Sequence, residues 1–126
     1  MSPIVSSPEE RVSNTERFLA YLAAYARKDL AAIREMFSED IQLRDWNIAV
    51  RGRDAAIDVT AKNFNTADTI EIDPLALYIS EGAVAGELKI VVDKRIKLRV
   101  VDVISFNAQG KISAVRAYLG RDDDQC

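Results

Sequence analysis

Residues 96–106 read IKLRVVDVISF, and every second residue from Ile96 onward is apolar except Asp102. Because successive side chains of a strand point to opposite faces, this alternation predicts a strand that carries Asp102 on its apolar face. An ionised carboxylate on that face costs several kcal/mol unless it is paired. Asp102 is therefore expected to have a partner, to face a water-lined cavity or to stay protonated through a raised pKa. The plainer alternative is that Asp102 only satisfies a neighbouring hydrogen-bond donor.

The composition is that of one ordinary globular domain. Of the 126 residues, 48% are hydrophobic and 29% charged, which is enough apolar material for a core. We expect a single domain over 1–126 with flexible ends at 1–7 and 121–126. The net charge of −3, with no basic cluster longer than Lys94-Arg95, argues against nucleic acid as a partner.

The location of the protein is inferred from what the sequence lacks. No apolar run approaches the roughly 18 residues of a membrane span, and no secretory segment is recognisable, so we expect no membrane partner. The single cysteine, Cys126, is the last residue given, so an internal disulfide is excluded. These features favour a cytoplasmic location.

Histidine is absent from the sequence. Its absence excludes catalytic Ser/His/Asp and Cys/His arrangements and the common zinc-binding spacings. Proton chemistry would have to use Asp, Glu, Tyr or Lys side chains. No GxGxxG or P-loop motif is present, and the run 122–124 of aspartates lacks the loop and glycine of a calcium site, so we expect no cofactor and no metal.

The first half of the chain is mainly helical in pattern. The expected helices span 8–28, 30–37 and 53–64. Ser7-Pro8-Glu9-Glu10 is a candidate capping box for the first helix, and Asp29 suits the N-cap of the second. Between the second and third helices, 41–45 alternates as a strand, so that Asp45 is a second carboxylate at the end of an apolar face.

The second half of the chain has the pattern of a meander. The expected strands span 69–80, 83–92, 96–106 and 111–119, and 46–51 is a possible hairpin partner of the strand at 41–45. Pro74 within the first of these strands indicates a sheet edge or a bulge. The whole order predicts an α+β fold, in which a curved, mostly antiparallel sheet wraps on three N-terminal helices and leaves a cone-shaped cavity.

Several segments resemble the bacterial ketosteroid isomerases, within the nuclear transport factor 2-like and SnoaL-like superfamily. The similar segments are 21–28, Asp29-Leu30-Ala31-Ala32-Ile33, Met36-Phe37, Asp45, Val101-Asp102-Val103-Ile104-Ser105-Phe106, Gly110-Lys111-Ile112 and Arg116-Ala117-Tyr118. The resemblance runs from about Phe18 to Gly120 and implies the cone-shaped fold of that superfamily.

The resemblance also implies a site and an activity. Tyr21 and a protonated Asp102 would donate hydrogen bonds to the carbonyl oxygen of a hydrophobic ketone, and Asp45 would move the proton, so that an enone isomerises through a dienolate. The chain departs from the family at three positions. Trp46 follows the base where proline is usual, Thr60 stands near a supporting tyrosine of some members, and Leu119 replaces a tryptophan of one member.

The expected substrate pocket combines these positions with inward-facing apolar residues. Its expected lining is Phe18, Phe37, Trp46, Thr60, Leu88, Val100, Val115 and Leu119. Two alternatives remain open, a polyketide cyclase-like enzyme and a non-catalytic module for small-molecule binding or assembly. On the opposite sheet face, Val101 and Val103 with their apolar neighbours predict a homodimer interface.

Overall fold

The computed structural model describes residues 12–121 and confirms the α+β fold. Within these residues the helices are α1 (Asn14–Ala26), α2 (Leu30–Met36) and α3 (Arg53–Thr66). The strands are β1 (Phe37–Arg44), β2 (Ala49–Arg51), β3 (Ile70–Ser80), β4 (Ala83–Val92), β5 (Ile96–Phe106) and β6 (Ile112–Leu119). None of the helices in this range is long and apolar enough to cross a membrane.

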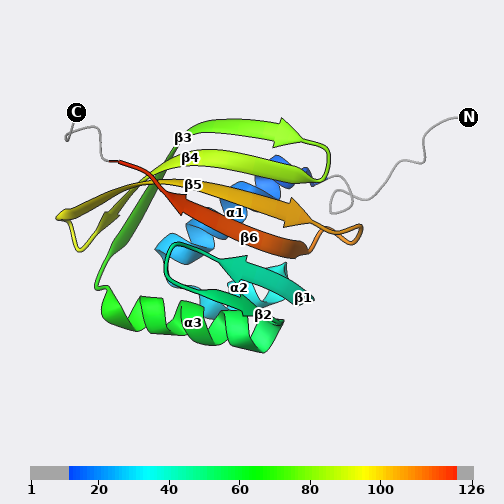
Figure 1. Cartoon of the computed structure of the whole chain (residues 1–126), viewed down its shortest axis with the longest axis horizontal. Coiled ribbons are helices and arrows are strands. Elements are labelled where there is room, and N and C mark those ends of the chain that lie inside the picture. Colours follow the sequence, from blue (N-terminus) through cyan, green and yellow to red (C-terminus); the bar gives the residue numbers. More distant parts are fainter. Residues whose placement is uncertain (1–11, 122–126) are drawn as a thin grey trace, which may run out of the picture.

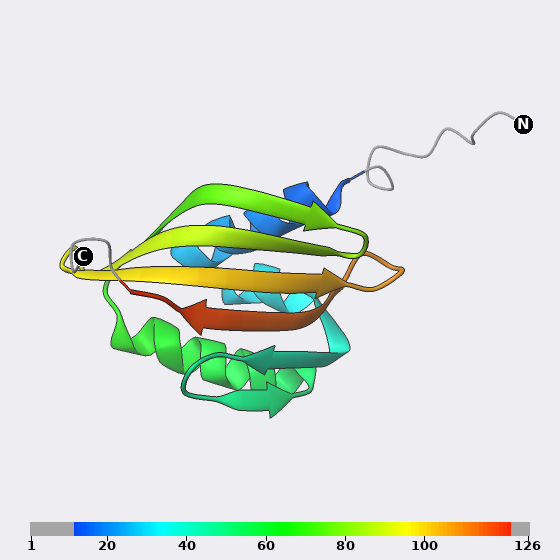
Figure 2. The ribbon, with the colours of Figure 1, turned by 45° about the horizontal axis from the view of Figure 1, so that its top comes forward.

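The strands form one curved, open sheet in the order β2-β1-β6-β5-β4-β3. All neighbouring pairs are antiparallel except β1 and β6, so the expected mostly antiparallel sheet is confirmed. In Figure 1, α1 lies behind the long strands, and α3 packs beside the β1–β2 hairpin. The view of Figure 2 shows that both helices lie on the same side of the sheet.

The first helix begins later than its sequence pattern suggests. Ser13 is the N-cap of α1, because its side chain accepts a hydrogen bond from the Glu16 N–H at 3.1 Å while Glu16 accepts from the Ser13 N–H at 3.4 Å. Val12 and Ser13 are not helical, so the prediction of a continuous helix over 8–28 is wrong. The proposed cap at Ser7 lies outside the described residues. Both serines precede a glutamate by three positions, and the motif alone does not choose between them.

The elements around the first carboxylate differ from their expected bounds, since β1 begins four residues before the expected strand 41–45 and ends one residue earlier. Phe37 is the first residue of β1 rather than the last of α2, and β1 ends at Arg44, directly before Asp45. The hairpin return at 46–51 is confirmed, because β2 pairs with β1 from Ala49 to Arg51. The alternative readings of Pro74 both hold, since β3 is an edge strand and its pairing shifts between Pro74 and Ala76.

The core fills one end of the curved sheet and leaves the other end free. Its fully buried large side chains are Phe18, Phe37, Ile33, Ile41, Leu88, Ile104, Ile112 and Val84. Along β5 the predicted alternation is confirmed, because Val100, Asp102, Ile104 and Phe106 are buried. Apolar residues that precede Asp102 on β5 line a cavity instead of packing in this core.

Candidate active site

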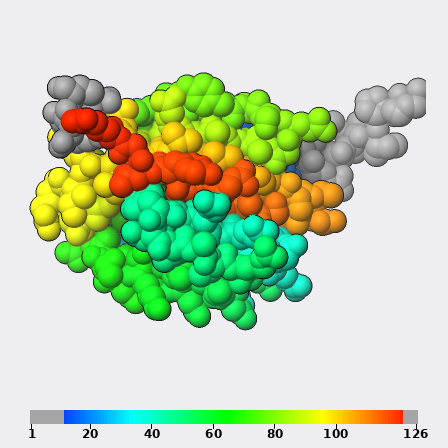
Figure 3. Space-filling model, viewed as in Figure 1, coloured from blue at the N-terminus to red at the C-terminus, as the bar shows by residue number. Residues whose placement is uncertain are grey.

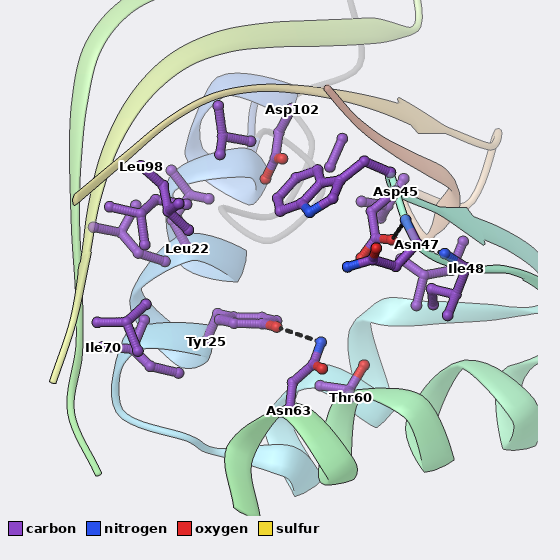
Figure 4. A pocket seen from close by; sticks show the side chains of 18 of the residues that line it. Leu22, Tyr25, Asp45, Asn47, Ile48, Thr60, Asn63, Ile70, Leu98 and Asp102 are labelled. Atoms are coloured by element: carbon purple, nitrogen blue, oxygen red, sulfur yellow. Dashed lines mark hydrogen bonds between the residues drawn. The ribbon is translucent and has the colours of Figure 1, made fainter. Parts of the chain in front are cut away.

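A cavity of about 280 Å³ lies between α1, α3, the β1–β2 turn and the concave face of β3–β6. Most of its wall is apolar and comes from Leu22, Leu43, Ile48, Ile70, Ile72, Ile90, Val92, Leu98, Val100 and Val115. Tyrosine, aspartate, threonine and asparagine side chains interrupt this wall at a few points, shown in part in Figure 4. An apolar cleft with a few polar groups is the usual form of a small-molecule site.

Asp102 lies deep in this cavity. Its side chain comes from the middle of β5, points into the open space in Figure 4, and the residue is only 8% exposed. The residues paired with it across the sheet are Gly86 and Ala117, and the small side chain of Ala117 borders the cavity. No hydrogen bond or ion pair joins the carboxyl group to any residue within 12–121.

This environment keeps Asp102 partly protonated near neutral pH. Burial, and then the negative charge of Asp45, raise the pKa of Asp102 from its ordinary 3.8 to about 7. Among the outcomes that the sequence left open, a raised pKa therefore describes this residue. A protonated carboxyl in an apolar site is a hydrogen-bond donor and an acid.

Tyr21 reaches the same cavity from α1. Its ring packs against Tyr25 and Phe37, each with a centroid separation of 6.0 Å, and the residue is 3% exposed. Burial, followed by the proximity of Tyr25 and Asp102, raises the pKa of Tyr21 well above its ordinary value. The phenol is thus a neutral donor, and its hydroxyl group has no hydrogen-bond partner within 12–121.

Asp45 shapes the β1–β2 turn as well as the cavity. Its Oδ1 accepts hydrogen bonds from the N–H groups of Asn47 at 2.7 Å and Ile48 at 2.9 Å, which makes an Asx turn. The other carboxylate oxygen accepts no hydrogen bond from the described part of the chain. Trp46 lies at the tip of this turn, lines the cavity and remains 45% exposed.

The remaining expected pocket residues fall into two groups. Trp46, Thr60, Val100 and Val115 line the cavity, whereas Phe18, Phe37, Leu88 and Leu119 are not part of its wall. Phe18, Phe37 and Leu88 fill the adjacent core. For Leu88, the alternation of a strand gives the face of the residue but not its position along the sheet. Leu119 is 46% exposed at the end of β6.

Thr60 does not take the place of a supporting tyrosine. Its hydroxyl group donates to the Ala56 carbonyl oxygen at 2.7 Å, one helical turn earlier. That proton is therefore unavailable to Tyr21 or to a bound molecule, and Thr60 contributes only an acceptor and a methyl group to the wall.

Two polar residues of the cavity were not singled out from the sequence. The Asn63 side-chain N–H donates to the Tyr25 hydroxyl oxygen at 3.2 Å, and both residues border the cavity. Tyr25 lies one helical turn after Tyr21, so its spacing already placed the two rings on one face. Asn63 is exposed on α3, and no sequence pattern marks it as a site residue.

The described residues offer no obvious metal centre. Within 12–121, no group of three or more His, Cys, Asp or Glu side chains is placed to hold a metal ion.

Comparison with known proteins identifies the family. Residues 18–115 match the SnoaL-like domain, and the chain belongs to this family, whose fold is nuclear transport factor 2-like. No curated protein matches the chain.

Solved structures share the fold over most of the chain. The epoxide hydrolase/cyclase-like enzyme SalBIII, which has a role in pyran ring formation in the polyether salinomycin, is 26% identical with a TM-score of 0.74. That match covers 90% of this chain and 93% of SalBIII. A protein assigned as a ketosteroid isomerase from Kribbella flavida is 12% identical with a TM-score of 0.75, over 86% of this chain and 78% of its own.

A third structure carries no functional assignment. The NTF2-like protein of unknown function from Cytophaga hutchinsonii is 10% identical with a TM-score of 0.74, over 87% of this chain and 92% of its own. At such identities the second and third likenesses show the fold alone.

Proposed function

We propose that this SnoaL-like protein is a cofactor-independent enzyme of the ketosteroid isomerase type, which moves a proton within a hydrophobic ketone. The observation that carries the proposal is the unequal pair of carboxyl groups in one apolar cavity. Burial and the charge of Asp45 raise the pKa of Asp102 to about 7, so one group can act as an acid while the other is ionised. A module that only binds its ligand has no need of such a difference.

The proposed reaction uses three side chains. Asp45 removes a proton from the carbon next to the carbonyl group of a β,γ-unsaturated ketone and returns it to the γ carbon. In the dienolate between these steps, negative charge develops on the oxygen, to which Tyr21 and protonated Asp102 donate hydrogen bonds. The oxygen of Asp45 that is not held by the turn is the base, since Oδ1 already accepts two backbone N–H groups.

The substitution Asp45→Asn tests the proposal. The amide oxygen can still accept from Asn47 and Ile48, so the turn is retained while the base is lost. We expect the isomerisation rate, followed by the absorbance of the conjugated product, to fall by about 100-fold or more. Binding of 2-naphthol, a planar phenolic mimic of the dienolate, should be unchanged or tighter because a negative charge disappears. Asp58→Asn, an exposed change on α3, is the matched control and should retain the wild-type rate.

The acid is tested in the same assay. Because Asp102 must be protonated to donate, the wild-type rate should decline as the pH rises through about 7. Asp102→Asn keeps a donor but not the titrating proton, so the rate should fall by about 10- to 1,000-fold and lose this decline. A wild-type protein that converts no β,γ-unsaturated ketone and binds no 2-naphthol contradicts the isomerase proposal. Binding without conversion would favour the non-catalytic module.

The likeness to SalBIII supports a second candidate, a cyclase that closes an oxygen ring. In that reaction a substrate hydroxyl group attacks an epoxide carbon, so that a new C–O bond forms and the epoxide C–O bond breaks. Asp102 would donate its proton to the released oxygen, and Asp45 would accept the proton of the attacking hydroxyl group. Turnover of a hydroxy-epoxide in the absence of enone isomerisation would favour this candidate.

A further inference from the structure

Tyr25 and Asn63 form a polar pair that the proposed proton transfer does not use. Tyr25 comes from α1 and Asn63 from α3, and the Asn63 N–H donates to the Tyr25 oxygen at 3.2 Å. Figure 4 shows the pair on the opposite side of the cavity from Asp102. The pair is therefore a further polar point, remote from Asp102, in a largely apolar wall of the described residues.

The pair lies at the mouth of the cavity. The cavity-lining residues that are exposed come from two elements: Asn63 and Thr66 from α3, and Trp46 and Asn47 from the β1–β2 turn. Asp102, in contrast, is buried. The opening thus lies between this turn and α3. A molecule that enters it passes the Tyr25–Asn63 pair before it reaches Asp102.

The ring of Tyr25 is held in place by its aromatic neighbours. Its centroid is 4.9 Å from that of Phe64, with an interplanar angle of 75°, and 6.0 Å from that of Tyr21, with an angle of 61°. Both contacts have edge-to-face geometry, which aromatic rings favour. The Tyr25 hydroxyl group is consequently oriented before any ligand binds, so little ordering is needed on binding.

Much of the hydrogen-bonding capacity of the pair is unused. The Tyr25 oxygen accepts from Asn63, but no residue within 12–121 accepts the Tyr25 proton or donates to the Asn63 amide oxygen. Burial is the largest cause that raises the pKa of Tyr25, so its hydroxyl group is neutral near pH 7. The pair thus presents the free Tyr25 O–H donor, the second N–H of the Asn63 amide and the free Asn63 amide oxygen as an acceptor.

A hydroxyl group matches this arrangement, because it can accept from Tyr25 and donate to Asn63 at the same time. A carbonyl or ether oxygen could accept from the donors but would leave the Asn63 amide oxygen without a partner. Most of the cavity wall is apolar, as Ile70 beside Tyr25 in Figure 4 illustrates, although Thr60 lies next to Asn63. The molecule that carries the hydroxyl group should therefore be largely apolar.

We propose that the Tyr25–Asn63 pair is a second subsite, which binds a hydroxyl group of the substrate remote from its reacting oxygen. This inference rests on the proposed function for the placement of the reacting oxygen at Asp102. It narrows the substrate class to hydrophobic ketones, or hydroxy-epoxides, that carry a hydroxyl group at the end nearer the mouth.

The test compares two kinds of probe by isothermal titration calorimetry. One is 2-naphthol, which has a single hydroxyl group for the Asp102 end of the cavity. The others are 1,5-, 1,6-, 2,6- and 2,7-dihydroxynaphthalene, which add a second hydroxyl group at different separations from the first. At least one dihydroxynaphthalene should bind the wild-type protein about 2- to 10-fold more tightly than 2-naphthol, as expected for one added hydrogen-bonding group.

Tyr25→Phe and Asn63→Ala should each abolish this preference while the affinity for 2-naphthol changes less than about 2-fold. Asn65→Ala on α3 and Tyr118→Phe on β6 are matched controls outside the cavity wall and should keep the preference. Circular dichroism identifies any variant that fails to fold. If one of Tyr25→Phe and Asn63→Ala does not fold, the other variant is used for the test.

The outcomes separate this inference from the proposed function. A wild-type protein that shows no preference for any dihydroxynaphthalene, or variants that retain the preference, would overturn the second subsite even if the enzyme isomerises enones. A preference that depends on Tyr25 and Asn63 would support the subsite even if no isomerisation is detected. Binding of neither probe by the folded wild-type protein would overturn the subsite, because no hydroxyl group is then recognised.

Discussion

Asp102 is buried without a described partner, and the cost of that burial should appear in the pH dependence of stability. The pKa of Asp102 is about 7 in the folded protein, against the ordinary 3.8 of an exposed aspartate. Between these values the folded protein holds a proton that the unfolded chain releases, so the wild-type free energy of unfolding falls as the pH rises from about 4 to 7. At pH 8 the folded protein then carries a buried charge.

Asp102→Asn should remove this dependence. Relative to the wild type, we expect the variant to gain up to roughly 4 kcal/mol of stability between pH 4 and pH 8, from about 1.4 kcal/mol for each pKa unit. Urea unfolding of both proteins at these two pH values measures the change. An equal difference between the two proteins at both pH values would mean that Asp102 titrates normally in the folded state.

At the scale of the elements, the space around Asp102 depends on how β4 packs against α1. Gly86 pairs with Asp102 and has no positive φ, so the reason for glycine is steric. A Cβ atom at this position would lie 2.5 Å from the Phe18 Cζ and 3.0 Å from a methyl group of Leu77. Phe18 therefore occupies the space beside the glycine, in the core rather than in the cavity wall.

Gly86→Ala should consequently overpack this contact. We expect a loss of about 1–3 kcal/mol in the free energy of unfolding, the usual cost of an added methyl group in a close-packed core. A second substitution, Phe18→Leu, removes part of the ring and should be less destabilising in the Gly86→Ala background than in the wild type. Chemical denaturation of the four proteins gives this coupling. Strictly additive effects would show that Phe18 does not restrict position 86.

The sequence predicts the elements better than it predicts the wall of the cavity. Alternation along residues 96–106 was sufficient to place Asp102 on a buried face, and the pattern of 41–45 placed Asp45 at the end of a strand. Leu88 follows the same alternation but lies in the core, because only the packing of α1 decides where the core ends along β4.

The residues at the mouth of the cavity could not be predicted from the sequence pattern, for a different reason. Asn63 is an exposed polar residue on a helix, and such residues usually face only solvent. Its contact with Tyr25 joins residues 38 positions apart and follows from the packing of α3 near α1, which no local spacing encodes.

At the scale of the whole molecule, one face of the sheet remains without a described covering element. The helices lie on the concave side in Figure 1, and in the same view of Figure 3 the atoms of β6 form part of the open surface. Val101 and Val103 point to this face from β5. On β6, Val101 pairs with Tyr118, which is 49% exposed, and Val103 pairs with Arg116. Ala85, on the neighbouring strand β4, pairs with Val103 and extends the apolar surface.

We expect a second copy of the chain to cover this face, because a two-fold axis would bring the same apolar strip of each copy together. Light scattering at micromolar concentration should then give twice the 14.0 kDa mass of the chain. Val103→Glu places a charge in the strip and should yield monomers, whereas Lys62→Glu, on the exposed side of α3, changes a charge elsewhere and should leave the mass unchanged. Both variants should keep the wild-type circular dichroism spectrum. A wild-type mass of 14.0 kDa would contradict the dimer, since the strip would then remain in contact with water.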